Sequence, residues 1–290
     1  MKVKVLFIVG EGRSGSTLLE KALASSPGVF GAGELIHVWE RGFLDNQLCA
    51  CGEPFKSCSL WRQVSDELKD ASPKQALKAL RRVRLRYFWR KPSEDELWLR
   101  ELHYRLYATL KRLTGARLII DSSKHPVYAR LMASHPLVEP LVLHLVRDPR
   151  GVAYSWSKKK RRPEITAHEA YMPRYSPLRS ALSWLVVNAL SEQLARRLPY
   201  LRVRYEDFVK RPKDTLERIG RFVGLEGLGA VAGDGHLELK KTHQVAGNPS
   251  RFKEGRVELK PDEAWKESMP PLSKLIVSLL THPLRKRYYG

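Results

Sequence analysis

The sequence predicts an α/β fold in which a central parallel sheet is flanked by helices. Residues Val3 to Val9 form a short apolar run, typical of a strand buried on both faces of such a sheet. Three further short strands are predicted later in the chain, and helical patterns follow them. A glycine-rich turn after the first run indicates a P-loop-containing nucleotide-binding fold.

That turn predicts an anion-binding loop. Gly10 and Gly15, followed by Ser16 and Thr17, almost match the Walker A pattern, but its lysine is missing and Arg13 lies inside the loop instead. We expect Ser16 and Thr17 to cap a helix whose N-terminus and backbone N–H groups hold a phosphate. The loop is therefore predicted to bind a nucleotide phosphate without being built for ATP hydrolysis. The alternative is that its glycines serve packing alone.

Length and composition limit the classes of protein. A chain of 290 residues is expected to form a single α/β domain, with a helical and cysteine-containing insertion at about residues 43–115. No apolar run is long enough to span a membrane, so we expect a soluble, cytoplasmic protein without a transmembrane segment. The net charge of +21 indicates a polyanionic partner, which includes nucleic acid, anionic membrane and an anionic cofactor or substrate.

A glutamate follows the first helix at a position suited to catalysis. Glu34 comes 21 residues after Arg13, at the expected mouth of a strand. A carboxylate beside a phosphate-binding loop is electrostatically unfavourable unless it has a function, and a general base that accepts a hydroxyl proton has one. An exposed loop glutamate or a partner of a helix N-cap is the alternative.

All three cysteines of the chain, Cys49, Cys51 and Cys58, lie within ten residues. Such clustering is compatible with a zinc site, a local disulfide or redox pair, or packed free thiols. A closed zinc site needs four ligands, so His37 or His103 would have to fold over the cluster.

The stretch from Leu60 to about Leu113 has a helical pattern, with Pro73 and Pro92 at plausible helix starts. We interpret it as an inserted helical layer. Its aromatic residues are assigned to the core: Tyr87, Phe88, Trp89, Trp98, Tyr104 and Tyr107.

A second strand, over residues 117–120, ends just before Lys124 and His125. Ligands of open parallel sheets bind beyond the carboxyl ends of the strands, so both side chains are in position to act on one. Lys124 would neutralise a leaving oxygen and His125 would transfer a proton. Capping of the next helix is an equal alternative for His125.

A third strand, over residues 141–146, leads into Arg147, and Ser155 follows eight residues later in a helix that starts near Pro149. Both side chains are therefore able to face one anion from different elements. An ordinary salt bridge and an incidental serine are the alternative.

The loop over residues 158–177 is of the kind that closes over a substrate. Its basic run Lys158–Arg162 is interpreted as a solvated face, with an anion-facing rim as the alternative. Tyr205, at a strand exit, is expected to stack on a base or to pack against Phe208. Residues 237–255 show neither a helical nor a strand period and are interpreted as a lid or as flexible surface. The remaining elements are a helix, a strand and two helices, over residues 178–198, 201–204, 212–223 and 272–280.

Together these motifs resemble those of sulfotransferases that use 3′-phosphoadenosine 5′-phosphosulfate (PAPS), most closely bacterial members related to tyrosylprotein and carbohydrate sulfotransferases. The resemblance implies a loop for the 5′-phosphosulfate, a pair for the 3′-phosphate, a tyrosine on the adenine and a late nucleotide-covering segment. The loop residues are Gly12, Arg13, Ser14, Gly15, Ser16 and Thr17, and the pair for the 3′-phosphate is Arg147 and Ser155. The tyrosine on the adenine is Tyr205, and the late segment contains Gly247, Asn248 and Arg251.

Two branches of that family suggest different catalytic bases. Gly33-Glu34 resembles the Gly-Glu of tyrosylprotein sulfotransferases, whose glutamate is the base, and Lys124 resembles their lysine at the leaving oxygen. His125 lies close to where cytosolic sulfotransferases carry their catalytic histidine. We favour Glu34. The loop has Arg13 where the cytosolic branch has lysine, and the cysteine-containing insertion is absent from the branches with well-understood acceptors, so the acceptor does not carry over.

The resemblance implies in-line transfer of a sulfuryl group from PAPS to a hydroxyl or amine of a small-molecule, peptide or carbohydrate acceptor. The nucleotide product is 3′-phosphoadenosine 5′-phosphate (PAP), and no metal is required. Glu34 or His125 would accept the proton, while Arg13 and Lys124 would stabilise the departing oxygen. His37, His168 and Arg174 are weaker candidates for the acceptor side.

Two other functions are alternatives to sulfuryl transfer. A P-loop kinase is disfavoured by the missing lysine, and a non-catalytic nucleic-acid-binding protein is supported only by the net charge of +21. We therefore expect no specific nucleic-acid partner. The sequence predicts neither the oligomeric state nor the state of the cysteines.

Overall fold

The computed structural model describes residues 1–85, 92–165 and 169–290, and its centre is a parallel sheet of five strands in the order β2-β3-β1-β4-β5. The predicted α/β fold with a central parallel sheet is confirmed. The strands are β1 (Val3–Val9), β2 (Val29–Gly33), β3 (Leu118–Lys124), β4 (Val138–Val146) and β5 (Tyr200–Arg204).

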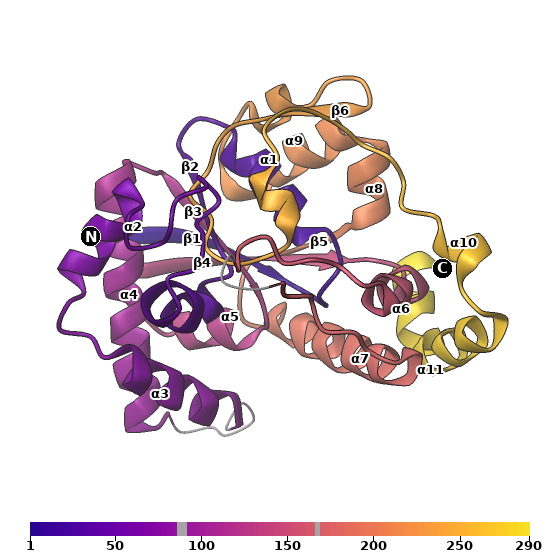
Figure 1. Ribbon diagram of the computed structural model, residues 1–290, viewed down its shortest axis with the longest axis horizontal. Helices are drawn as coiled ribbons and strands as arrows, with labels where there is room; N and C mark the ends of the chain where they lie inside the picture. The colour runs from indigo at the N-terminus through magenta and orange to yellow at the C-terminus, as the bar shows by residue number, and fades with distance from the viewer. Residues whose placement is uncertain (86–91, 166–168) are drawn as a thin grey trace.

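Helices cover both faces of the sheet because the central strand is apolar on both (Figure 1). Val5 and Phe7 of β1 pack on one face and Leu6 and Ile8 on the other, as the two-residue period of a strand requires. The first face is covered by α4 (Glu94–Thr114), α5 (Val127–Met132) and α7 (Pro177–Leu194). The second is covered by α1 (Ser16–Ala24), α8 (Tyr205–Lys210) and α9 (Pro212–Val223).

The stretch predicted to be helical, residues 60–113, contains three α-helices among its described residues. Its third α-helix, α4, starts at Glu94 and not at Pro92, because the Ser93 side chain accepts the Glu96 N–H and caps it. Tyr87, Phe88, Trp89 and His168 lie outside the described residues. The elements between β2 and α4 are η1 (Leu35–His37), the π-helix η2 (Val38–Leu44), α2 (Ser59–Glu67) and α3 (Pro73–Leu85).

The prediction that residues 237–255 contain no strand was wrong at both ends of this segment. Two short antiparallel strands, β6 (His236–Leu239) and β7 (Gly255–Glu258), pair across this segment, and η4 (Pro249–Phe252) lies between them. Strands of four residues are too short to show a period, and each is stabilised by its distant partner. Other elements are α6 (Pro149–Ser157), η3 (Leu228–Val231), α10 (Trp265–Ser268) and α11 (Pro271–Tyr289).

Two helix ends also differ from the prediction. Helix α7 ends at Leu194 rather than at residue 198, because the chain turns before Pro199 and enters β5. Helix α11 continues to Tyr289 and includes Pro283. No helix among the described residues is long and apolar enough to cross a membrane.

The carboxyl ends of the strands meet at one edge of the sheet, and this geometry determines the site. The loop after β1, Glu34 after β2, Lys124 at the end of β3, Arg147 after β4 and Tyr205 after β5 all lie along this edge. The registers β1/β3 and β2/β3 shift near their ends, as is common beside functional sites.

Candidate active site

The loop after β1 buries polar atoms in a way that suits an anion. Gly15, with φ of 87°, is the N-cap of α1, so Ser16 and Thr17 are its first residues and not its caps as predicted. Ser14 Oγ and the Nε and Nη2 atoms of Arg13 are buried without a hydrogen-bond partner in the part of the chain that the structure describes. Leaving buried donors unpaired costs free energy, which an anionic ligand would recover.

Arg13 is held in this loop by an aromatic wall. Its guanidinium lies 4.7 Å from the ring centroid of Trp156, and a Cβ on Gly12 would come within 2.7 Å of the same ring. Burial lowers the pKa of Arg13, with Glu34 opposing the shift and Arg147 adding to it. Arg13 therefore remains a desolvated cation at the entrance of α1.

Glu34 and Lys124 form an ion pair beside that loop. Lys124 Nζ donates to Glu34 Oε1, and His37 Nε2 lies 3.7 Å from Glu34 Oε2. Burial alone raises the pKa of Glu34, but Lys124, His37 and Arg41 outweigh it and lower the pKa to about 2. The Glu34 carboxylate is therefore ionised and shielded from bulk water. Its partner Lys124 is a cation that a bound anion is able to attract away from it.

Backbone strain is concentrated at these residues. Arg13, Lys124 and Ala246 are non-glycine residues with positive φ, at 66°, 65° and 55°. Such conformations cost free energy and persist only where the surroundings fix them, as they do around functional side chains.

The backbone of Glu34 is fixed by three hydrogen bonds. Gly33 N donates to Glu20 Oε1 over 2.6 Å, Glu34 N donates to Val245 O over 2.9 Å, and Ile36 N donates to Ser123 Oγ over 2.9 Å. Gly33 has to be glycine, because a Cβ there would lie 2.1 Å from Val245 O. Glu34 is thus presented by a backbone that three separate segments hold in place.

A buried acidic network lies beneath this support. Glu20 accepts hydrogen bonds from Gly33 N and from Ser122 Oγ, and Asp121 accepts from Tyr107 Oη over 2.6 Å. Burial raises the pKa of Glu20 to about 7 and that of Asp121 to about 6, despite these donors. Sequence reasoning missed Glu20, although a charged residue on the apolar face of α1 was a usable signal.

The raised pKa of Glu20 predicts a loss of stability with rising pH. The folded protein keeps the Glu20 proton up to about pH 7, whereas the unfolded chain releases it near 4.5, so the free energy of unfolding falls between these values. In Glu20→Gln this fall should shrink by up to about 3 kcal/mol. Urea unfolding at pH 5 and pH 8 measures it, with Glu226→Gln, at an exposed position, as the control. An unchanged pH dependence in Glu20→Gln would contradict the assignment.

Arg147 reaches across the end of the sheet to the loop. Its Nη1 donates to Arg13 O over 2.9 Å, its Nη2 donates to Asp262 Oδ2 over 2.8 Å, and its guanidinium lies 4.6 Å from the Tyr205 ring centroid. The same tyrosine ring fills the space beside Gly15, where a Cβ would lie 2.5 Å from it. Arg147, which was predicted to bind a phosphate, is therefore paired with the carboxylate of Asp262.

Ser155 lies half-buried in α6, which begins directly after Arg147 and Asp148. Asp148 caps this helix by accepting the Arg150 N–H, and Pro149 is its first residue, as predicted. The unit formed by β4 and α6 thus carries Arg147 and Ser155 on two adjoining elements.

The late segment lies against both Glu34 and the loop. A Cβ on Gly247 would be 3.3 Å from Glu34 Oε1, and Asn248 N donates to Thr17 Oγ1 over 3.2 Å. Arg251 is fully buried, and its Nη1 donates to Gly247 O over 2.8 Å. Gly247 and Asn248 therefore border the site. The hydrogen bond from Arg251 to Gly247 O stabilises the turn between these two residues.

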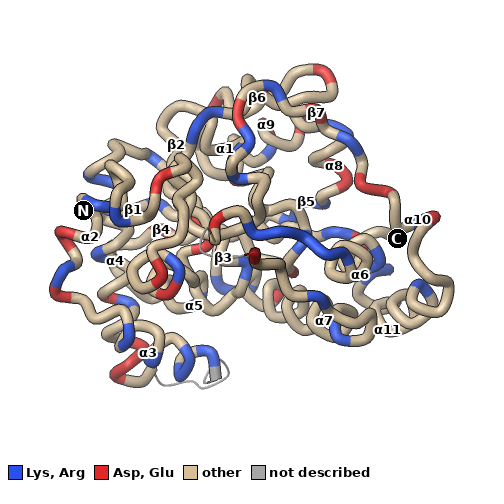
Figure 2. The backbone as a smooth tube through the Cα atoms, in the orientation of Figure 1, with Lys and Arg blue, Asp and Glu red and all other residues tan. Residues whose placement is uncertain are grey.

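Basic side chains form a rim over the same site. Figure 2 shows a run of Lys and Arg crossing the front of the molecule beside α6, where the chain continues from Ser157 into Lys158–Arg162. Lys160 Nζ donates to Asn248 Oδ1 over 2.9 Å, and burial together with the charge of Arg13 lowers its pKa. Lys158–Arg161 are exposed, as predicted for a solvated face, and Lys160 also contacts the segment that borders the site.

The histidines divide into different roles. His125 Nδ1 accepts the Val127 N–H at the start of α5, and burial lowers the pKa of His125 to about 4. His37 is paired with Glu34, and His103 is buried between Leu99 O and Tyr128 Oη. Neither His37 nor His103 therefore joins the cysteine cluster.

Arg174, a candidate for the acceptor side, is exposed, and its Nε donates to Ser157 O.

A buried carboxylate and several cations beside an anion-binding loop are typical of enzymes that transfer a charged group. Comparison with known proteins identifies the family of this chain. A family model described as the sulfotransferase family matches residues 6–228. The chain belongs to the sulfotransferase family. It is accordingly a sulfotransferase enzyme, and the predicted family is confirmed.

Solved structures support this fold. The sulfotransferase domain from the Synechococcus PCC 7002 olefin synthase is 23% identical with a TM-score of 0.56, over 100% of this chain and 97% of that one. The sulfotransferase domain from the curacin biosynthetic pathway is 18% identical with a TM-score of 0.53, over 97% of this chain and 98% of that one. No match was found among curated proteins.

Proposed function

We propose that this sulfotransferase moves a sulfuryl group from PAPS to a hydroxyl or amine of a small-molecule, peptide or carbohydrate acceptor. The observation that carries the proposal is the shielded Glu34 carboxylate, paired with Lys124 beside the buried and unpartnered donors of Arg13. The closeness of Glu34, Lys124 and the Arg13 loop supports the roles of base, leaving-group cation and anion loop for them.

The residues of this chain fit a nucleotide with phosphate at both ends. Arg13, Ser14 and the N-terminus of α1 would hold the 5′ end, since their buried donors need an anion. Arg147 and Ser155 would hold the 3′-phosphate, which would replace Asp262 on the arginine. Tyr205 would contact the adenine. The basic rim that includes Lys160 favours this highly charged ligand.

PAPS, when bound, supplies a sulfuryl group attached to a good leaving phosphate. Glu34 would accept the proton of the attacking hydroxyl as the new S–O bond forms. Lys124 would turn from Glu34 to the bridging oxygen that departs with the electron pair of the breaking bond, while Arg13 stabilises the same charge. Loss of the Lys124 contact raises the pKa of Glu34 above about 2 and makes it a better base at the moment of transfer.

Thermal unfolding with nucleotides tests the donor. A ligand present at 100 times its Kd adds about 2.7 kcal/mol to the free energy of unfolding. We expect PAP to raise the Tm clearly, and AMP, which lacks the 3′-phosphate, to raise it far less at the same concentration. Arg147→Ala should abolish the difference between PAP and AMP. Stabilisation by ATP with Mg²⁺ but not by PAP would favour a kinase, and salt-sensitive DNA or RNA binding without a PAP response would favour a nucleic-acid-binding protein.

A further inference from the structure

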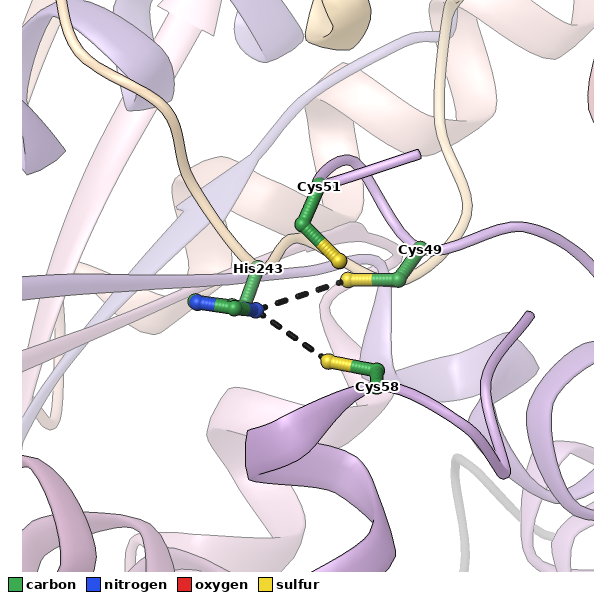
Figure 3. Close-up of side chains that lie close together, drawn as sticks. All are labelled: Cys49, Cys51, Cys58 and His243. Atoms are coloured by element: carbon green, nitrogen blue, oxygen red, sulfur yellow. Dashed lines mark hydrogen bonds between the residues drawn. The ribbon is translucent and has the colours of Figure 1, made fainter. Parts of the chain in front are cut away.

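The three cysteines of the chain meet a histidine from a distant segment. Cys49, Cys51 and Cys58 lie on the cysteine loop, residues 49–58, and His243 precedes the segment that borders Glu34. The Sγ atoms of the cysteines and a ring nitrogen of His243 all lie within 4.8 Å of one another. Figure 3 shows the four side chains converging from these two parts of the chain.

The distances between the candidate ligand atoms lie near those of a tetrahedral zinc site. His243 Nδ1 lies 3.9 Å from Cys49 Sγ and 3.2 Å from Cys58 Sγ. With Zn–S bonds of about 2.3 Å and a Zn–N bond of about 2.0–2.1 Å, a tetrahedral zinc ion would separate its ligand atoms by about 3.5–3.8 Å. Small side-chain adjustments are therefore enough to bring all four atoms to zinc.

Backbone N–H groups and a helix N-terminus face the sulfur atoms. Backbone N–H groups donate to the sulfur atoms: Cys51 N–H to Cys49, Glu53 N–H to Cys51, and the N–H groups of Leu60 and Trp61 to Cys58. Cys58 is also the N-cap of α2, where the helix dipole favours negative charge. Such hydrogen bonds to sulfur are the usual support of metal-bound cysteine.

The position of His243 is fixed independently of its ring. Its carbonyl oxygen accepts the Trp61 Nε1–H over 2.7 Å, and the next carbonyl, Gln244 O, accepts the Ala50 N–H over 3.0 Å. These bonds fasten residues 243–244 to the start of the cysteine loop and to α2, the helix that follows it. The backbone of His243 therefore directs its imidazole toward the three cysteines. A disulfide would use two of the sulfur atoms and would leave the third cysteine and His243 without a function.

From this juxtaposition we propose that Cys49, Cys51, Cys58 and His243 bind one structural zinc ion. Four protein ligands leave no open position for a substrate, so the ion is structural and takes no part in the transfer. It joins the cysteine loop to the segment that continues through Val245, which pairs with Glu34. The zinc would thereby fix one wall of the active site from outside it.

Metal analysis of the full chain tests the proposal without an activity assay. Protein purified under reducing conditions and supplied with zinc should hold about one zinc per chain. Replacement by Co²⁺ should give the intense visible bands of a tetrahedral site and a sulfur-to-cobalt charge-transfer band. Neither measurement on the unmodified chain depends on the folding of a variant. Wild-type protein that stays metal-free with three titratable thiols, or that contains a disulfide, would overturn the proposal.

Variants identify the ligands. Cys58→Ser and His243→Asn should lose the metal, whereas His243→Cys, which restores four ligands, should retain it with a cobalt spectrum shifted toward four-sulfur coordination. His282→Asn, at an exposed histidine of α11, is the matched control and should keep the full metal content. Undiminished zinc in His243→Asn would overturn the assignment of His243. PAP binding is measured separately, so a failure of the zinc site and a failure of the proposed donor are distinguishable.

Discussion

Replacement of Glu34 by Gln should reduce the rate of sulfuryl transfer by roughly 10²- to 10⁴-fold, the usual contribution of a general base. Gln keeps the size of the side chain but does not accept the proton of an attacking hydroxyl. PAP affinity should be unchanged or higher, because removal of this anion leaves Lys124 and Arg41 free to attract the phosphates. Single-turnover kinetics and PAP titration measure the two effects separately.

His125→Asn is the control that separates the two candidate bases. An asparagine oxygen is able to accept the Val127 N–H that His125 Nδ1 accepts now, so the start of α5 should survive. Activity within a few-fold of wild type is expected. A full loss of transfer in His125→Asn, or an equal loss of PAP binding in Glu34→Gln, would remove Glu34 from the role of base.

The pH profile gives a second readout of the same assignment. A base must be deprotonated, so activity is lost as the pH falls through its pKa. In the free enzyme Lys124 and its neighbours hold the pKa of Glu34 at about 2, so kcat/KM should show no acidic limb from Glu34 above about pH 3. We proposed that Lys124 turns to the donor in the complex, which would raise the pKa of Glu34. The acidic limb of kcat should therefore lie at higher pH than that of kcat/KM.

The residues at the strand ends were predictable from the sequence for a physical reason. Glu34, Lys124, Arg147 and Tyr205 each lie at or directly after the end of a short strand, and the ends of parallel strands meet at one edge of the sheet. Local order along the chain is therefore enough to bring these side chains to one region. The Walker-like loop before α1 was recognisable in the same way, from residues that are neighbours in the sequence.

Contacts between distant segments were not predictable in this way. Val245 pairs with Glu34, and His243 faces Cys58, only because the late segment folds back along β2 and the cysteine loop. No period marks such a segment, since its backbone bonds are made by partners some 200 residues away. The contact of Asp262 with Arg147 has the same origin, and the sequence carried no signal for it.

Arg13→Ala should lower kcat/KM for transfer by about 100- to 1000-fold, which corresponds to roughly 3–4 kcal/mol of lost transition-state stabilisation. PAP binding should weaken as well, because the same guanidinium is expected to contact the donor before and during transfer. Arg13→Lys should recover only part of the loss, since an ammonium keeps the charge but not the planar set of donors. Steady-state kinetics and PAP titration on the three proteins measure this order.

The stability of Arg13→Ala separates a ligand-binding role from a structural one. Arg13 buries Nε and Nη2 without a partner among the described residues and adopts a positive φ, so the nucleotide-free protein gains little from this side chain. We expect its Tm to be unchanged or higher in Arg13→Ala, and higher still in Arg13→Gly, which also relieves the φ of 66°. Arg202→Ala removes a guanidinium that lies the same 4.7 Å from an aromatic ring, that of Tyr288, and should leave transfer intact. A fall in Tm in step with the loss of transfer would mean that Arg13 supports the loop and does not bind the donor.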